Sequence, residues 1–170
     1  MSISVYDQCV ATMRYMLKNL DNIVTRAEEH AAAGDIDPAA LLQARLFPNM
    51  RNFIFQIQVA TDIAKSSAAR LTGSELPKWP DDEETFADVH ARIGKAIDYL
   101  DSFEPKQFEG VEKRDIELNL RGHKLNFTGQ NYILRFVIPN FYFHMTTAYN
   151  LLRHNGVALG KPDFLGKLTD

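Results

Sequence analysis

Four long segments of this 170-residue chain repeat apolar residues at spacings of three, four and seven, and this period constrains the fold more than any other feature. Such spacing places apolar side chains on one face of an α-helix. The segments cover about residues 3–33, 48–72, 81–102 and 130–154. Each helix needs a partner to bury its apolar face, so the pattern predicts an all-α four-helix bundle.

Turn and cap residues separate these segments. Gly34 and Gly73 end the first and second long helices, because glycine adopts the left-handed conformation without penalty. Asp37 and Pro38 predict the start of a short helix, with the aspartate as N-cap. Residues 81–84 are four carboxylates at the expected start of the third long helix, where the amide end of the helix dipole favours negative charge.

Between residues 115 and 128 the period changes from helical to alternating. Apolar residues alternate with polar ones on both sides of the Arg121-Gly122 pair, which is typical of a short β-hairpin. We expect this hairpin just before the last helix, within a single domain over residues 1–170. An irregular α+β fold, in which the hairpin joins a further sheet, is the alternative. In the last segment, Pro139 predicts either a kink or a restart of the helix.

Charge and hydropathy exclude several classes of protein. With 19 basic and 22 acidic residues, the net charge of −3 argues against a nucleic-acid-binding protein. The most apolar window, residues 132–152, is interrupted by charged and polar residues, which is typical of a core rather than a membrane span. No signal peptide is recognisable and a lone cysteine cannot form an intrachain disulfide, so we expect a cytoplasmic protein. Cys9 lies at helical spacing between Val5 and Met13, which indicates a buried apolar residue.

A few polar residues fall on the predicted core faces. Gln56 shares the apolar stripe of the second long helix, His144 shares that of the fourth, and Asn140 lies on its flank. A buried polar group without a partner costs about 1–3 kcal/mol, so we expect this polar trio to meet one another or a ligand. Tyr149, further along the fourth helix, completes the candidate binding residues. A core network that sets the helix register is the structural alternative.

No sequence motif assigns a catalytic residue or a metal ligand. The five histidines show no His-x-x-x-His spacing, and no Glu-x-x-His pair predicts a di-metal bundle. Glycine-rich phosphate loops and the Gly-x-Ser-x-Gly nucleophile motif do not occur in the sequence. Motifs therefore predict no cofactor.

Two signatures, in the centre of the chain and near its C-terminus, carry a family resemblance. They comprise Gln56–Asp62, Ala64–Gly73, Pro139–His144, Ala148–Gly156 and Gly160–Gly166. With them the chain resembles, over nearly its whole length, a bacterial family of uncharacterised proteins in the DinB/YfiT-like superfamily. The resemblance implies a DinB-like four-helix bundle, a fold that often holds a divalent metal on three histidines. Known members of the superfamily include thiol transferases and mycothiol-dependent isomerases, and many are homodimers.

The resemblance also implies where a site would lie. Two fourth-helix histidines of the superfamily, four residues apart, correspond to Asn140 and His144, and its second-helix histidine falls near Gln56. One of these three positions is histidine in this chain, and amides are poor ligands for zinc or nickel compared with imidazole. The resemblance thus implies a retained pocket with an incomplete ligand set, and we expect no resident metal or other cofactor.

We therefore expect an uncharacterised DinB-like protein with a small polar pocket inside the bundle, a small-molecule ligand and a homodimeric state. Neither nucleic acid nor a membrane is expected as a partner. Two alternatives stay open. In one, the chain is a divalent-metal-dependent transferase or hydrolase that acts on a small molecule, with His144 as general base or single imidazole ligand. In the other, it is a non-catalytic binding or dimerisation module, and the polar trio is a structural network.

Overall fold

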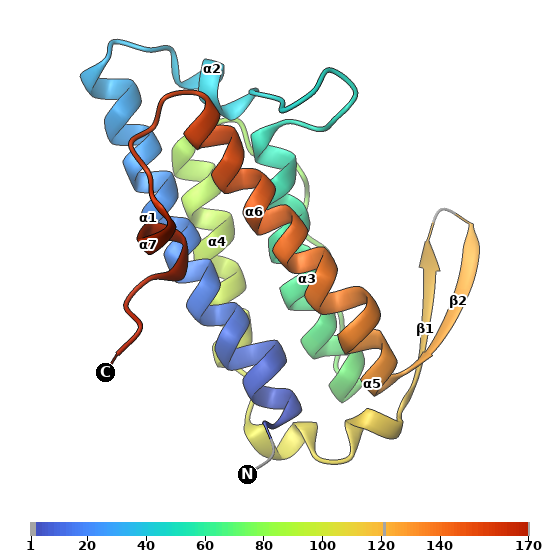
Figure 1. Ribbon diagram of the computed structural model, residues 1–170. Helices are drawn as coiled ribbons and strands as arrows, with labels where there is room; N and C mark the ends of the chain where they lie inside the picture. The colour runs from blue at the N-terminus through green and yellow to red at the C-terminus, as the bar shows by residue number, and fades with distance from the viewer. Residues whose placement is uncertain (1–2, 121, 170) are drawn as a thin grey trace.

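Four long helices lie side by side around one apolar core (Figure 1). The structure is a computed structural model that describes residues 3–120 and 122–169. The long helices are α1 (Thr12–Ala33), α3 (Phe53–Thr72), α4 (Phe86–Asp101) and α6 (Ile138–His154). The expected all-α bundle with a hairpin before the last helix is confirmed. Within the described ranges, no helix combines the length and the apolarity that crossing a membrane requires.

Shorter elements connect or extend the long helices. They are η1 (Asp7–Ala11), α2 (Pro38–Leu42), η2 (Pro105–Phe108), η3 (Val111–Lys113), α5 (Gly129–Tyr132), η4 (Ile133–Val137) and α7 (Lys161–Leu165). Of these, η1 and η4 are π-helical, whereas η2 and η3 are 3₁₀ turns. The side chain of Asp37 caps α2 as expected, because it accepts a hydrogen bond from the amide of Ala39.

The hairpin consists of β1 (Asp115–Leu120) and β2 (His123–Thr128), and it stands beside the α5 end of the bundle (Figure 1). The strands are antiparallel, with Ile116 opposite Phe127. Among the described residues the two strands pair only with each other, so the alternative of a further sheet is wrong. Arg121, half of the expected turn pair, lies outside the described residues.

The start of α3 differs from the expectation. The helix begins at Phe53 rather than near Pro48, because the side-chain oxygen of Asn52 accepts a hydrogen bond from the amide of Phe55 and caps the helix there. At its other end, Gly73 ends α3 as expected, with a left-handed φ of 75°.

The acidic run before α4 has a different role from the expected one. Thr85 caps α4 in a reciprocal capping box with Asp88, and hydrogen bonds from the Thr85 hydroxyl and from backbone amides lower the pKa of Asp88. Residues 81–84 therefore precede the helix, and the expectation that they form its first turn is wrong. Asp81 and Glu83 instead form ion pairs with a buried arginine of α4.

α5, η4 and α6 follow one another as one helical path, and Pro139 occupies the first turn of α6. Proline carries no amide hydrogen, so it is tolerated in a first turn but interrupts the hydrogen bonds of a helix interior. The π-helical η4 directly precedes it, and such wide turns are frequent at functional sites. Pro139 therefore follows a π-helical turn within a continuous helical path, and the expected restart of the helix is not observed.

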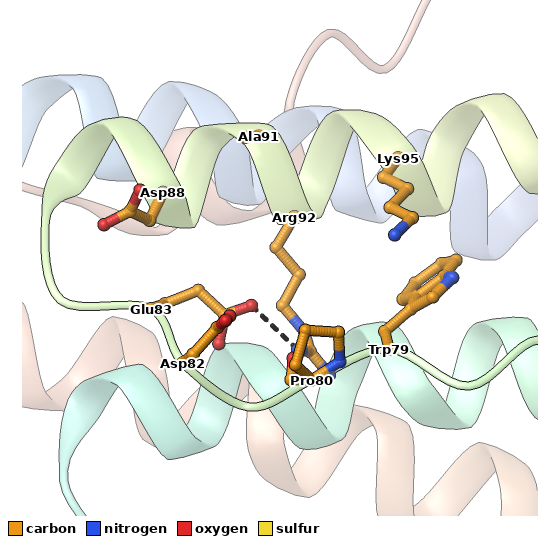
Figure 2. Close-up of a pocket in the computed structure, with 8 residues that line it drawn as sticks. All are labelled: Trp79, Pro80, Asp82, Glu83, Asp88, Ala91, Arg92 and Lys95. Atoms are coloured by element: carbon orange, nitrogen blue, oxygen red, sulfur yellow. Dashed lines mark hydrogen bonds and ion pairs between the residues drawn. The ribbon is translucent and has the colours of Figure 1, made fainter.

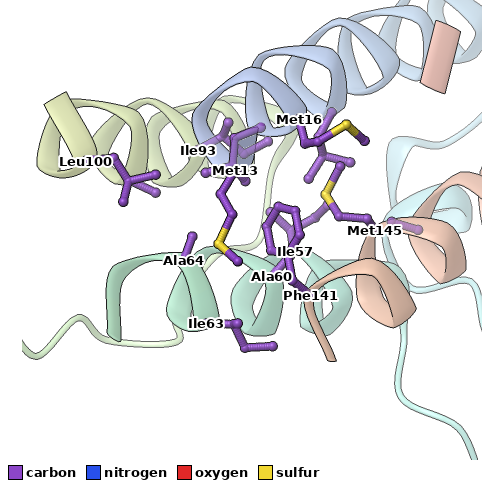
Figure 3. Close-up of a cluster of buried hydrophobic side chains, with 14 of the residues drawn as sticks. Met13, Met16, Ile57, Ala60, Ile63, Ala64, Ile93, Leu100, Phe141 and Met145 are labelled. Carbon is purple, nitrogen blue, oxygen red and sulfur yellow. The ribbon is translucent and has the colours of Figure 1, made fainter. Parts of the chain in front are cut away.

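All four long helices contribute to the core (Figure 3). Met13 of α1, Ile57 of α3, Ile93 of α4 and Phe141 of α6 are each at most 1% exposed. Small residues on α3 allow its neighbours to approach closely. These fully buried residues are Ala60, Ala64, Ser67 and Ala68. Cys9 is also fully buried, as expected, and burial raises the pKa of its thiol to about 12.

The neighbouring helices α3 and α4 run in the same direction (Figure 1). A connection between two such helices must return along the length of the bundle. Residues 73–85 form this returning connection, and they contain no helix or strand. Because the segment has no hydrogen-bonded ladder of its own, side chains must hold it in place.

A buried arginine holds the returning connection (Figure 2). Arg92 of α4 is 4% exposed, and its guanidinium donates to the carbonyl of Pro80 and to the carboxylate of Glu83, both at 2.8 Å. On the α3 side it donates to the Thr61 hydroxyl at 2.9 Å and to the Asp62 carboxylate at 3.1 Å. One side chain thus joins α3, α4 and the connection, an arrangement we term the Arg92 clamp.

Trp79 of the connection packs beside this clamp. The ammonium groups of Lys65 and Lys95 lie over its ring, 4.1 and 4.9 Å from the ring centre, as cation–π contacts. The ring also packs edge-on against Tyr99 at 6.3 Å. A hollow of about 300 Å³ remains beside Trp79 (Figure 2). The cations that line it, Arg92 and Lys95, are already engaged, which indicates a structural role.

The C-terminal arm lies along α1. Arg26 forms an ion pair with Asp163 at 2.7 Å, and the Tyr15 hydroxyl donates to a backbone carbonyl at the end of α7 at 2.7 Å. Gly166 has a φ of 69°, and a side chain at this position would collide with Asn19. Glycine therefore allows the arm to approach α1 closely.

Replacing Arg92 by methionine tests the Arg92 clamp. The change keeps a long side chain and removes the guanidinium, so Glu83 loses its ion pair and retains the hydrogen bond from Gln58, and the Pro80 carbonyl loses its donor. We expect the free energy of unfolding to fall by about 3–5 kcal/mol. The matched variant Lys95→Met removes one cation from the face of Trp79 and should cost at most about 1 kcal/mol. Urea denaturation measures both, and equal losses would contradict the clamp.

Candidate functional site

Gln56 and His144 meet across the contact between α3 and α6. Gln56 stands near the start of α3 and is 2% exposed. Its side-chain oxygen lies 2.8 Å from Nδ1 of His144 on α6. The expected meeting of these two side chains is confirmed. The expectation that His144 is buried needs correction: its side chain is half-buried, because it lines an open cleft.

The hydrogen bonds of Gln56 determine which nitrogen of His144 carries the proton. The amide nitrogen of Gln56 donates to the carbonyls of Arg51 and Asn52, at 3.0 and 3.3 Å. The amide oxygen therefore faces the imidazole, and since an oxygen of this kind only accepts, Nδ1 of His144 carries the hydrogen. Nε2 is left with a lone pair. Among the described residues, Nε2 has no hydrogen-bond partner.

Aromatic rings flank the imidazole. The ring centres of Phe55 and Phe143 lie 6.3 and 5.2 Å from that of His144, and both rings are edge-on to it. Burial disfavours the charged imidazolium and lowers the pKa of His144 to about 4. At pH 7 the side chain is therefore a neutral imidazole, with Nε2 as a hydrogen-bond acceptor.

The open hollow beside this ring is termed the His144 cleft. It has a volume of about 660 Å³ and lies between α3, η4, α6 and the end of β1. Most of its lining residues are apolar. They are Phe55, Val59, Leu120, Arg135, Phe136, Pro139, Asn140, Phe143 and His144. An apolar cleft with a few converging polar groups is the usual form of a small-molecule site.

The two other candidate residues lie differently with respect to this cleft. Asn140, one turn before His144 on α6, lines the cleft and is half-buried. Tyr149 lies outside it, since its ring packs edge-on against Phe164 of α7 at 5.9 Å. The structure thus joins Gln56 to His144 and places Asn140 beside His144 in the cleft, but among the described residues Asn140 has no hydrogen bond to either. It puts Tyr149 against the C-terminal arm.

Sequence reasoning missed two arginines. Arg92 follows Val89 by three residues and precedes Ala96 by four, so it lies on the buried stripe of α4, and this spacing was a signal of its burial. Arg70 is half-buried on α3 and lines a second groove next to the His144 cleft. No spacing in the sequence distinguishes Arg70 from an ordinary surface arginine.

The residues at the three superfamily positions do not fit a divalent metal. The amide nitrogen of Gln56 is engaged with two carbonyls and its oxygen with His144. Only Nε2 of His144 and the amide of Asn140 remain, whereas zinc sites use three or four protein ligands, chiefly imidazole, thiolate or carboxylate. Among the described residues, no three histidine, cysteine, aspartate or glutamate side chains gather as a ligand set. We assign no chemical step to a metal.

The low pKa of His144 predicts a loss of stability in mild acid. In the unfolded chain this imidazole takes up a proton near pH 6.5, but in the folded chain only near pH 4. The unfolded state therefore binds more protons between these two values, and stability falls as the pH drops from about 6.5 to 4. Allowing for solvent at the open side of the ring, we expect a loss of about 1–2 kcal/mol.

Urea denaturation of the wild type and of His144→Gln at pH 7 and pH 4 measures this loss. The carboxylates titrate in both proteins, so their contribution cancels in the comparison. The variant lacks the imidazole and should lose less stability than the wild type by the stated amount. Parallel pH profiles of the two proteins would show that His144 is not held neutral by the fold.

Comparisons with known proteins show the family of this chain and support its fold. The model of a family described as a domain of unknown function, DUF1993, matches residues 5–165. A crystal structure of a DinB family member protein from Shewanella denitrificans is similar to 98% of this chain and to 94% of that chain, with 40% sequence identity and a TM-score of 0.89. No curated protein matches the sequence. The resemblance noted in the sequence is confirmed: the chain belongs to the DUF1993 family and, with it, to the DinB-like helical proteins.

Proposed function

We propose that the protein binds a small molecule in the His144 cleft, and that Nε2 of His144 accepts the hydrogen bond that orients it. The observation that carries this proposal is the direction of the Gln56 amide, which leaves Nε2 unprotonated. The apolar walls of the cleft would bury the body of the ligand, and an O–H or N–H group of the ligand would donate to Nε2.

The chemistry of His144 favours binding over proton transfer. A general base works best when its pKa is close to the operating pH. With a pKa of about 4, His144 abstracts protons poorly at pH 7, whereas it accepts hydrogen bonds well. The side-chain atoms left to ligate a metal, Nε2 of His144 and the amide of Asn140, also give no support to the alternative of a divalent-metal-dependent transferase or hydrolase.

Phenol and its methyl ether, anisole, test this function as matched probes. Both fill an apolar cleft, but only phenol carries a hydroxyl that can donate to Nε2. We expect phenol to bind more tightly than anisole by roughly 0.5–1.5 kcal/mol and to shift the NMR signals of His144 and Asn140. The difference should vanish in His144→Phe and persist in the control His154→Phe, which changes an exposed histidine at the end of α6.

The same samples separate binding from the metal alternative. Titration with Zn²⁺ or Ni²⁺ should show no stoichiometric metal whose binding depends on His144. Stoichiometric metal that is lost in His144→Phe would support the metal-dependent alternative instead. Equal binding of phenol and anisole to the wild type would sink the proposed role of Nε2.

We also propose that the protein is a cytoplasmic homodimer. A cytoplasmic location is supported by the single cysteine, Cys9, which is buried and has no second cysteine in the chain to pair with. The homodimer is supported by exposed apolar side chains at the rim of the cleft, where Phe143 is 56% and Leu120 44% exposed. Contiguous apolar surface of this kind marks interaction sites.

Sedimentation velocity tests the homodimer. We expect a species of twice the chain mass of 19.3 kDa, because burying Phe143 against a second copy removes apolar surface from water. Phe143→Ser should shift the distribution toward the monomer. The control Leu168→Ser, on the C-terminal arm and 75% exposed, should not. A monomer at every concentration would contradict the proposal.

A further inference from the structure

The His144 cleft adjoins a second hollow, which we term the Arg70 groove. This groove has a volume of about 740 Å³ and lies between α3, α6, β1 and the returning connection. The two hollows share the lining residues Val59, Leu120, Phe136 and Asn140. Together they form one trough along the seam between α3 and α6. Gln56, which holds His144, and Arg70 are separated by about 21 Å along α3, so the trough is elongated.

The two buried or half-buried cations of the Arg70 groove differ in their partners, because Lys65 pairs with a carboxylate and Arg70 does not. Lys65 and Asp62 line the groove as an ion pair 2.7 Å apart, and Lys65 also faces Trp79. Arg70 differs from Lys65, because its guanidinium donates to the neutral hydroxyl of Tyr132 at 3.2 Å. Among the described residues, no carboxylate lies within ion-pair distance of Arg70. Its remaining N–H groups are therefore available to an anion.

Other lining residues add positive charge or donors. Lys78 of the returning connection is exposed at the groove, and Ser66 lies one turn before Arg70 on the same face of α3. Arg135 lines the His144 cleft. Asp62, which is already paired, is the one carboxylate among the residues that line the trough. Since the chain as a whole carries a net charge of −3, this positive character is local to the trough.

The rest of the trough is chiefly apolar. Val59 and Phe136 separate the two polar ends, and Leu76, Leu118 and Leu120 line the side formed by the connection and β1. A ligand that matches this surface has an apolar body and an anionic group at one end. One unpaired guanidinium suits a monoanion, and its planar fork of donors matches a carboxylate.

We infer that the trough binds an elongated amphipathic carboxylate, with the carboxylate on Arg70 and the apolar body along the seam between α3 and α6 toward His144. The inference rests on the proposed function, because the His144 cleft forms half of the same trough. Arg70 is then the residue that selects an acid over a neutral molecule of the same shape.

Calorimetric titration with decanoate and with decanamide tests the inference. The two probes have the same chain and a head group of similar shape, but only decanoate is charged. We expect decanoate to bind about 10- to 100-fold more tightly than decanamide to the wild type. Arg70→Gln should remove this preference and leave decanamide binding unchanged. Arg70→Lys should retain part of it, and the control Arg153→Gln, an exposed arginine that does not line the trough, should retain all of it.

The ratio of the decanoate and decanamide affinities of the wild type tests the inference even if Arg70→Gln folds poorly, because it needs no variant. Tyr132→Phe provides a second check, since it removes the partner of Arg70 and keeps the guanidinium, and it should still prefer decanoate. Equal binding of decanoate and decanamide, or a preference that survives in a folded Arg70→Gln, would overturn the inference. If phenol still distinguishes His144 in that case, the proposed function stands. If neither phenol nor decanoate binds, both proposals fail.

Discussion

The Arg92 clamp is the interaction on which the shape of the molecule depends. Because α3 and α4 run in the same direction, residues 73–85 must return along the bundle without strand partners, and only side chains hold them. A buried guanidinium without partners would be strongly destabilising, but a hydroxyl, a carbonyl and carboxylates surround this one. The clamp also holds Leu76 and Trp79 near α3, so it builds one wall of the Arg70 groove.

Gln56 holds the imidazole ring of His144 in one orientation, as Arg92 holds the returning connection. It reaches back to two carbonyls at the start of α3, and these bonds leave its oxygen no direction but toward His144. At a position where the family resemblance implies a metal-binding histidine, the chain carries a residue that orients another side chain. A buried amide is well suited to this task, because its donor and acceptor ends are distinct and neither changes charge with pH.

Much of this could be predicted from helical periodicity. Gln56 and His144 interrupt apolar stripes, so their inward position followed from the sequence. The direction of the Gln56 amide and the opening beside His144 did not, because both depend on how α3, α6 and β1 pack. The start of α3 was misplaced because the Asn52 cap acts after Pro48. The Arg92 clamp did not follow from periodicity, because the partners Thr61, Pro80 and Glu83 come from α3 and from a connection whose course the helical pattern does not predict.

The burial of Cys9 has a practical consequence. A thiol reacts as its thiolate, and with a pKa of about 12 and no exposed surface this one is inert in the folded chain at neutral pH. It is also the single cysteine of the chain. Alkylation by an external reagent therefore requires the bundle to open around η1, so the rate of labelling reports the frequency of that opening. The native sequence thus contains its own probe of breathing motions, in the core near Tyr132, the hydrogen-bond partner of Arg70.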